Sequence, residues 1–214
     1  MTHPHPWLDR SHDLDSLDKL RTVYEPPTAP ATLDKECDHV HPLYRPFIEA
    51  APFCVLATCG PQGLDASPRG DPAGRLVEVV DEKTLLLPDR RGNQRIDSLR
   101  NLLHAPEMAL LFLIPGIGET LRVNGAARIS AAPALLRRCE FEGRLPCSVL
   151  VVEVRRVFFQ CARAIKRSNL WEPAARVERG ALPSTGSILQ ALSRQVNGAA
   201  YDAALQERQR QTLY

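Results

Sequence analysis

Arginine side chains are concentrated in two turns that follow predicted strands. The run 67–71 (SPRGD) closes one strand, and the run 88–95 (PDRRGNQR) joins another strand to a helix. Arginine donates paired hydrogen bonds to phosphate oxygens. A helix N-terminus adds free backbone N–H groups and about half a positive charge. The two turns therefore predict a site for a phosphate or another anion.

Two residues of the second turn are expected at the beginning of the helix, Asn93 as the N-cap and Arg95 in the first turn. A cation in the first turn opposes the helix dipole, so an anionic ligand explains it better than helix stability does. The alternative is that these arginines pair with Asp71, Asp89 and Asp97 on the surface. For any single arginine, composition alone favours this alternative.

Other motifs exclude several classes of site. The sequence has neither the G-x-x-x-x-G-K-[ST] phosphate loop nor a Gly-x-Ser-x-Gly elbow, and the run 116–118 (GIG) precedes a strand instead of a helix. The pairs His3/His5 and His39/His41 lack partners at ligand spacing, so we expect surface histidines and no metal site. The net charge of +2, from 27 basic and 25 acidic side chains, is too small to indicate a nucleic-acid binder.

The cellular context is predicted from the start of the chain and from its cysteines. The first 15 residues lack a basic region followed by an apolar core, and the most apolar run, 108–117, is about half as long as a membrane helix. The six cysteines form no C-x-x-C pair, which is typical of reduced thiols, and Cys54 and Cys161 are expected to be buried. We therefore expect a soluble cytoplasmic protein that binds no membrane.

The 214 residues suit one domain with extensions. Eight of the 18 prolines precede residue 53, which separates a helical, proline-rich arm (1–52) from a barrel domain (53–172) and a helical tail (173–214). Within the arm, apolar spacing predicts an amphipathic helix over 9–24, ended by Pro26-Pro27, an irregular segment over 25–36 and a helix over 42–51.

The barrel domain is predicted to be mainly β. Alternating or apolar runs bounded by turn residues predict strands at 53–58, 64–69, 75–81, 84–88, 108–114, 119–130 and 149–160. Gly125 suggests a bulge in its strand. Helices are predicted at 93–104, 132–142 and 187–211. Short strands with hairpin connections and one intervening helix indicate an α+β fold built on an antiparallel, six-stranded barrel with peripheral helices.

Several of these motifs, in this order, resemble the flavin-binding proteins related to pyridoxamine 5′-phosphate oxidase. The matching runs are DASPRGD (65–71), LLLPDRRGN (85–93), RIDSLRN (95–101), PGIGETLRVNG (115–125) and CARAIKRSNLW (161–171). The resemblance implies a split β-barrel that binds FMN at a homodimer interface and acts on a small molecule. It covers neither the arm nor the tail after about residue 175.

The resemblance also implies roles for individual residues. Ser67 and Arg69 would lie beside the flavin's ribityl phosphate, which Asn93 and Arg95 would hold. The end of strand 84–88 would run along the flavin, and a C-terminal segment would approach its ring, where a cation favours reduction. The complete set of implied FMN-binding residues is Ser67, Arg69, Pro88, Asp89, Arg90, Asn93, Arg95, Arg122, Lys166, Arg167, Ser168 and Trp171. Arg122 would lie near the dimer seam, and Trp171 could instead pack the C-terminal segment onto the barrel.

One departure separates the chain from true pyridoxamine phosphate oxidases. These end in a segment with Arg and His that grips the substrate phosphate, whereas this chain ends in ERQRQTLY. The vitamin substrate therefore does not follow. An FMN-dependent oxidoreductase is the leading hypothesis. The alternatives are a non-catalytic carrier or sensor of flavin or another cofactor, and a split-barrel dimer that has lost its ligand.

Overall fold

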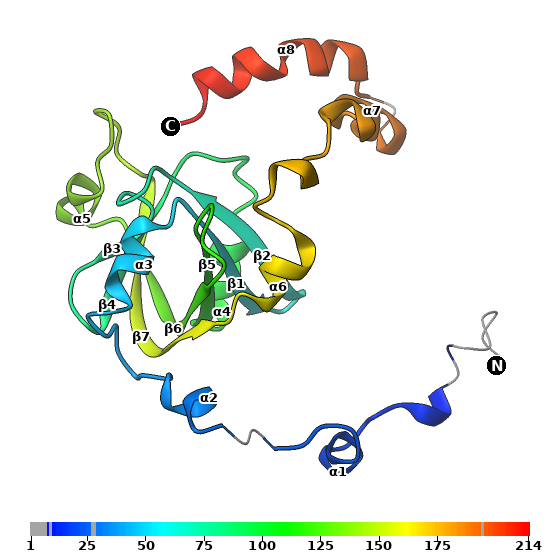
Figure 1. Ribbon diagram of the computed structural model, residues 1–214. Helices are drawn as coiled ribbons and strands as arrows, with labels where there is room; N and C mark the ends of the chain where they lie inside the picture. Colours follow the sequence, from blue (N-terminus) through cyan, green and yellow to red (C-terminus); the bar gives the residue numbers. More distant parts are fainter. Residues whose placement is uncertain (1–7, 9, 27–28, 194) are drawn as a thin grey trace. The chain divides into compact units, whose positions relative to one another are not determined.

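A computed structural model describes residue 8 and residues 10–26, 29–193 and 195–214 of the chain (Figure 1). The chain forms two compact units, Met1–Lys35 and Glu36–Tyr214, and each is described by itself. Residues 36–52 therefore group with the second unit. The three-part division at 52 and 172 stays a prediction.

The described residues of the first unit form short helices: a 3-10 turn at Arg10–His12, α1 at Leu17–Arg21 and α2 at Ala31–Asp34. The prediction of one helix over 9–24 was wrong for the described part of that range. The segment predicted to be irregular over 25–36 contains the short helix α2. Residues 9, 27 and 28 lie outside the described residues. Ser16 begins α1 as an N-cap, since its Oγ accepts from Lys19 N. No residue of α1 is buried, so packing does not sustain a longer helix.

The second unit is built on one antiparallel sheet with the strand order β2-β1-β5-β6-β7-β4-β3. The strands are β1 (Phe53–Gly60), β2 (Gly63–Gly70), β3 (Glu78–Val79), β4 (Thr84–Asp89), β5 (Glu107–Leu113), β6 (Thr120–Ser130) and β7 (Ser148–Gln160). This is the predicted α+β split barrel, with two corrections. The sheet has seven strands instead of six, with β2 and β3 as its open edges, and the strand predicted at 75–81 is only the two-residue β3.

Alternating buried residues along the strands form the main core, and Leu86, Cys139 and Val149 form a second, smaller cluster. In β1, Cys54, Leu56 and Thr58 are buried, and they face the buried Phe112, Leu110 and Met108 of β5 in the register of the sheet. The turn at 60–63 joins β1 to β2 as predicted, and Gly63 takes the positive φ of 103° that a tight hairpin turn favours.

The bulge predicted at Gly125 is confirmed. The register between β6 and β7 shifts between Asn124 and Gly125, and a Cβ on Gly125 would lie 2.1 Å from the Glu153 carbonyl oxygen. Only glycine lets the two strands approach this closely. Across the bulge, Arg155 and Arg156 are both exposed, whereas Val154 and Val157 on either side of them are buried.

Helices lie around the sheet, and further helices follow in the C-terminal region (Figure 1). They are α3 (Arg45–Ala50), α4 (Asp97–His104), α5 (Pro133–Arg138), α6 (Arg163–Ser168), two 3-10 turns (Pro173–Ala175 and Arg179–Ala181), α7 (Thr185–Leu192) and α8 (Gly198–Gln211). The single helix predicted at 187–211 is thus two helices. Asn197 begins the second of them because its side chain accepts a hydrogen bond from Ala200 N.

Helix α4 packs directly on β1. Asn101 Nδ2 donates to Thr58 Oγ1 at 3.0 Å in the buried contact between them. A Cβ at Gly60 would lie 2.1 Å from Asn101 Oδ1, so the glycine permits this approach. These contacts fix the axis of α4 and with it the position of its N-terminus.

All six cysteines are free thiols. Cys54 is buried, as predicted, but Cys161 is exposed, so that prediction was wrong. Cys161 directly follows the last residue of β7, where the buried alternation of the strand has ended. Among the residues that the structure describes, no helix is both long and apolar enough to cross a membrane.

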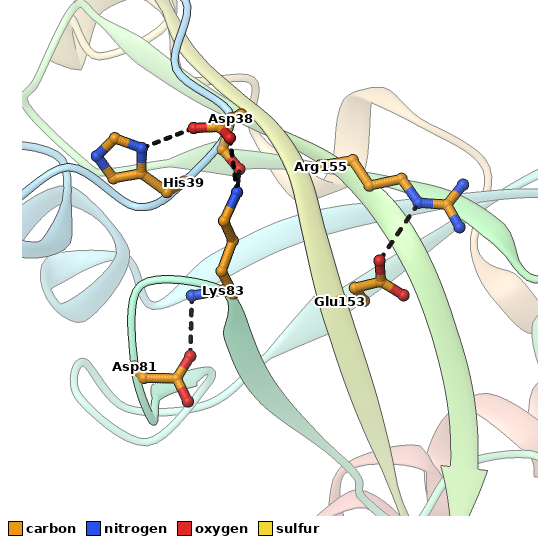
Figure 2. Close-up of polar contacts among 6 residues, drawn as sticks. All are labelled: Asp38, His39, Asp81, Lys83, Glu153 and Arg155. Carbon is orange, nitrogen blue, oxygen red and sulfur yellow. Dashed lines mark hydrogen bonds and ion pairs between the residues drawn. The ribbon is translucent and has the colours of Figure 1, made fainter.

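Polar contacts fasten the segment that enters the barrel unit (Figure 2). Lys83 Nζ donates to the carbonyl and carboxylate oxygens of Asp38, at 2.6 and 2.9 Å, and His39 Nδ1 lies 2.8 Å from the same carboxylate. The buried Val40 also donates its N–H to the Glu82 carbonyl. The loop between β3 and β4 therefore holds the incoming chain against the sheet.

Replacing Lys83 by methionine is expected to raise the pKa of Asp38. The hydrogen bond from Lys83 is the largest cause that lowers this pKa from 3.8 to about 2, and His39 adds to it. Because the folded-state pKa is lowered, the contact stabilises the fold above the ordinary pKa and loses that effect as the pH falls from 3.8 through about 2. Carboxyl NMR titration of both proteins measures the change.

Asp81 is the matched control for this titration. Its pKa is lowered by hydrogen bonds from the Lys83 backbone N–H and the Thr84 side chain, which the Lys83→Met substitution leaves in place. The pKa of Asp81 should therefore stay low in the variant. An unchanged pKa of Asp38 would show that the Lys83 ammonium does not hold this carboxylate.

Candidate functional site

A pocket of about 630 Å³ lies between β2, the end of β4, the start of β7 and the N-terminus of α4. Its size is typical of small-molecule and cofactor sites. Residues 89–96, from the last residue of β4 to the residue before α4, form one wall. The lining residues are Asp65, Ala66, Ser67, Pro68, Arg69, Asp89, Arg90, Arg91, Gly92, Asn93, Gln94, Arg95, Ile96, Asp97, Ser98, Leu99, Cys147 and Ser148.

Residues 65–69 of strand β2 all line this pocket. Asp65, Ser67 and Arg69 are half-buried, whereas Ala66 and Pro68 between them are exposed. Arg69 Nη1 donates to Ser67 Oγ at 2.8 Å and to the Pro68 carbonyl at 3.2 Å. Ser67 and Arg69, which the resemblance places beside the same phosphate, are thus in direct contact within one strand.

Burial raises, and the charge of Arg69 lowers, the pKa of two nearby groups, the Asp89 carboxyl and the Cys54 thiol. Burial raises the pKa of the Asp89 carboxyl, and the Arg69 guanidinium partly offsets that rise. Burial likewise raises the pKa of the Cys54 thiol to about 12, again opposed by Arg69. The guanidinium therefore supplies positive potential in the pocket, which Arg69 and Asp89 line, and the buried Cys54 remains a neutral thiol.

The 90–95 loop does not form the helix start that the sequence predicts. Helix α4 begins at Asp97, so Asn93 is not its N-cap and Arg95 is not in its first turn. Asn93 Oδ1 instead accepts from Arg95 N at 3.1 Å. Gln94 and Ile96 take positive φ angles of 59° and 53°, which break the helical path before residue 97. For a β-branched residue such as Ile96 this backbone is strained, and strain of this kind clusters at functional sites.

Two of the loop arginines have acidic partners that the surface-pairing alternative named, but one of the two pairs is buried. Arg90 Nε donates to Asp71 Oδ2 at 2.7 Å, in a pair whose side chains are only 14% and 1% exposed. Arg95 Nε donates to Asp97 Oδ2 at 2.8 Å, but the Arg95 side chain is 74% exposed. Arg91 makes no ion pair within the described ranges of the chain. The pocket therefore has Arg69 and Arg91 as its least neutralised cations.

Ser148 is a pocket residue that the sequence analysis missed. It is 8% exposed, lines the pocket beside its ladder partner Asp89, and its Oγ has no hydrogen-bond partner among the described residues. A buried hydroxyl without a partner costs free energy, so a ligand atom is an expected partner. The predicted strand began at 149, and a lone serine before it carried no signal.

The pair His39/His41 lies outside this site. His3 and His5 lie outside the described residues. His39 contacts Asp38, and His41 Nδ1 accepts from Leu43 N at 3.1 Å.

The sequence profile of the family described as "Pyridoxamine 5'-phosphate oxidase" matches residues 40–161, which is more than half of the chain. The chain belongs to this family. None of the curated proteins that were compared with it matches significantly.

Solved structures with similar folds share little sequence with this family member. Group A Streptococcus HupZ is 18% identical over 54% of this chain and 89% of its own, with a TM-score of 0.44. A Clostridium acetobutylicum protein related to general stress protein 26, of the pyridoxinephosphate oxidase family, is 15% identical over 54% of this chain and 83% of its own, with a TM-score of 0.42. An F420 reductase is 20% identical over 53% of this chain and 93% of its own, with a TM-score of 0.35.

Half of the FMN-binding residues implied by the pyridoxamine 5′-phosphate oxidase resemblance line the pocket of one chain. These are Ser67, Arg69, Asp89, Arg90, Asn93 and Arg95. Pro88 is buried in β4 opposite Val149 and does not line the pocket.

The other half of that set lies elsewhere in this family member. Arg122 is exposed on β6 with its guanidinium 5.5 Å from the Phe158 ring. Lys166, Arg167 and Ser168 belong to α6, and none lines the pocket of its own chain. Trp171 Nε1 donates to the Ile117 carbonyl at 2.7 Å, a contact that packs the C-terminal segment onto the barrel.

Proposed function

We propose that this chain is a flavoprotein that binds FMN in the pocket and uses it as an oxidoreductase on a small molecule. The observation that carries the proposal is the convergence of six family-implied residues, from β2, β4 and the 90–95 loop, on one pocket. Membership in the family supports the same function. The arginine-rich turns that predict an anion site from the sequence are the walls of this pocket.

The pocket has the donors that a flavin phosphate requires. Arg69 and Arg91 are guanidiniums without a strong acidic partner, and the first backbone N–H groups of α4 line the pocket at residues 97–99. The buried Ser148 Oγ, which lacks a partner among the described residues, supplies one more donor. The 630 Å³ volume admits a ligand of this size. The residues present therefore fit FMN.

When bound, FMN supplies the redox chemistry, accepting a hydride or electrons from a reduced donor. The chain's own residues would bind the cofactor and orient it. Arg69 and Arg91 neutralise the phosphate, and Ser148 donates to a ligand oxygen. The half-buried Asp89, whose pKa is raised by burial, holds a proton to higher pH than an exposed carboxyl does and can exchange hydrogen bonds with ligand hydroxyls.

We further propose a homodimer in which the second copy completes the site. Lys166, Arg167, Ser168 and Trp171 do not line the pocket of their own chain, so a contribution from them to FMN would come from the partner. The side of the sheet opposite the core carries half-buried apolar residues: Val55, Ala109, Leu111, Leu113 and Phe158. Residues 149–154 at the start of β7 are mostly core residues, so β7 would contribute to this face through its later part.

The visible spectrum of the purified protein tests this proposal. We expect a flavin spectrum, either on purification or after incubation with FMN, and an extracted cofactor with the mass of FMN. Light scattering of the loaded protein at micromolar concentration should give a dimer mass. Protein that stays colourless after incubation with FMN would contradict the proposal and support a barrel that has lost its ligand.

Turnover separates the oxidoreductase from a flavin carrier or sensor. We expect the loaded protein to be reduced by a nicotinamide donor or another small donor and reoxidised repeatedly. Stoichiometric binding with no reduction by any donor would favour the carrier.

A further inference from the structure

The end of the C-terminal helical region reaches the edge of the pocket through one tyrosine. Tyr214 Oη donates to Asp71 Oδ1 at 2.9 Å, while Asp71 Oδ2 accepts from Arg90 Nε at 2.7 Å. The Tyr214 ring lies 5.0 Å from the Phe141 ring, and Arg144 Nη1 donates to the Tyr214 carbonyl oxygen. These contacts join residues far apart in sequence in one polar and aromatic cluster.

Within this cluster, Asp71 is held from two sides. Its side chain is 1% exposed, so both carboxylate oxygens need protein donors. Arg90 satisfies one oxygen and Tyr214 the other. Arg90 in turn donates to the Cys139 carbonyl at 2.7 Å and begins the loop that walls the pocket. The orientation of Arg90, and hence the start of the loop, depends on a carboxylate that Tyr214 helps to fix.

The same C-terminal segment also forms a second hollow beside the loop. This hollow, of about 630 Å³, is lined by Arg91 together with Gln206, Gln209, Arg210, Thr212 and Leu213. Arg91 lines the proposed FMN pocket as well. The C-terminal segment therefore meets the surroundings of the pocket at two places. Tyr214 contacts Asp71, which holds Arg90, and residues 206–213 lie beside Arg91 around the second hollow.

We propose that Tyr214 is a positioning residue for the pocket and couples docking of the C-terminal segment to ligand binding. Tyr214 does not itself line the pocket; it acts through Asp71 and Arg90. Because coupling between two binding events is reciprocal, a ligand on the loop strengthens docking of the segment as much as docking strengthens ligand binding. The identity of the ligand rests on the proposed function, but the positioning of the loop does not.

Tyr214→Phe tests the role of the hydroxyl, since phenylalanine keeps the ring on Phe141. Tyr201→Phe, in α8, is the matched control. The Tyr201 ring lies 4.2 Å from the Arg208 guanidinium carbon, and its hydroxyl has no hydrogen bond among the described residues. Both substitutions remove one hydroxyl from the same region, but only one of these hydroxyls reaches Asp71.

The first measurement is hydrogen exchange of the ligand-free protein. In Tyr214→Phe, amides of the 89–96 loop should exchange about three- to tenfold faster, while amides of β6 and β7 keep their rates; Tyr201→Phe should change neither. Unchanged loop exchange in Tyr214→Phe would overturn the positioning role. Equal acceleration in the core strands would also overturn it, because the effect would then be global destabilisation.

The second measurement is binding. Tyr214→Phe should weaken FMN about three- to tenfold and riboflavin, which lacks the phosphate, less. Reciprocally, FMN should slow tryptic cleavage after Arg208 and Arg210 in the wild type and protect less in Tyr214→Phe. Equal affinities and equal protection in the two proteins would overturn the coupling. Absence of FMN binding to the wild type would instead contradict the proposed function, and the exchange experiment would still decide the positioning role.

Discussion

Replacing Arg69 by alanine is expected to weaken FMN binding about ten- to a hundredfold, with a smaller loss for riboflavin. A hydrogen bond to a charged group contributes about 1.5–3 kcal/mol, and each 1.4 kcal/mol is about tenfold in affinity. Arg69 lies on the pocket side of β2, held by Ser67 Oγ, and has no ion-pair partner as close as those of Arg90 and Arg95. Titration of both flavins, followed by fluorescence, measures the two losses.

Two further arginine variants calibrate this result. Arg95→Ala should cost only a few-fold, because the side chain is largely exposed, screened by water and already paired with Asp97. The resemblance implies a phosphate contact for both arginines, but Arg69 is half-buried whereas Arg95 is largely exposed. Arg128→Ala, at an exposed position of β6 away from the pocket, should leave both affinities unchanged. Equal losses of FMN and riboflavin in Arg69→Ala would show that this arginine does not contact the phosphate.

Replacing Asp71 by alanine is expected to lower the free energy of unfolding by about 3–5 kcal/mol, because removing one partner of a buried ion pair leaves the other charge without compensation in a poorly solvated place. Here Arg90 would lose its carboxylate and Tyr214 its acceptor at the same time. Chemical denaturation of the wild type and the variant measures the difference.

Glu49→Ala is the matched comparison for that stability experiment. The Arg45–Glu49 pair is as short as the Arg90–Asp71 pair, at 2.6 against 2.7 Å, but both of its side chains are about half exposed. Exposed pairs contribute about 0–1 kcal/mol. If both variants lose the same stability, burial of the Asp71 pair is not what stabilises this region.

The sequence predicted most of the sheet because its signals are local. Gly60 and Gly63 bracket a hairpin, short apolar runs mark β1 and β5, and Gly125 marks a bulge, all within a few residues. The helix predicted at 9–24 failed because periodicity indicates an apolar face but not whether anything covers it. The helix start at Asn93 failed because two residues with positive φ, neither of them glycine, redirect the chain before Asp97.

The sequence predicted those residues of the candidate site that belong to a recognisable motif and also line the pocket. Ser67, Arg69 and the 89–95 run are recognisable by residue type and spacing. Ser148 and Tyr214 are not, since the role of each depends on partners distant in sequence: Ser148 pairs with Asp89 across the sheet, and Tyr214 reaches Asp71. Contacts of this kind leave no local pattern.

The strand order has a consequence for how the chain can fold as it is synthesised. Strands β3 and β4 precede β5 and β6 in the chain, yet β4 pairs only with β3 and with β7, the last strand. The buried side chains of β4, Leu85 and Leu87, therefore lack their permanent neighbours until β7 has left the ribosome. Non-local pairing of this kind makes folding slow and exposes apolar strands to aggregation in the meantime. The β1–β2–β5–β6 half can assemble first, and the last strand then joins the β3–β4 hairpin to it, bringing the two sides of the pocket together in one late step.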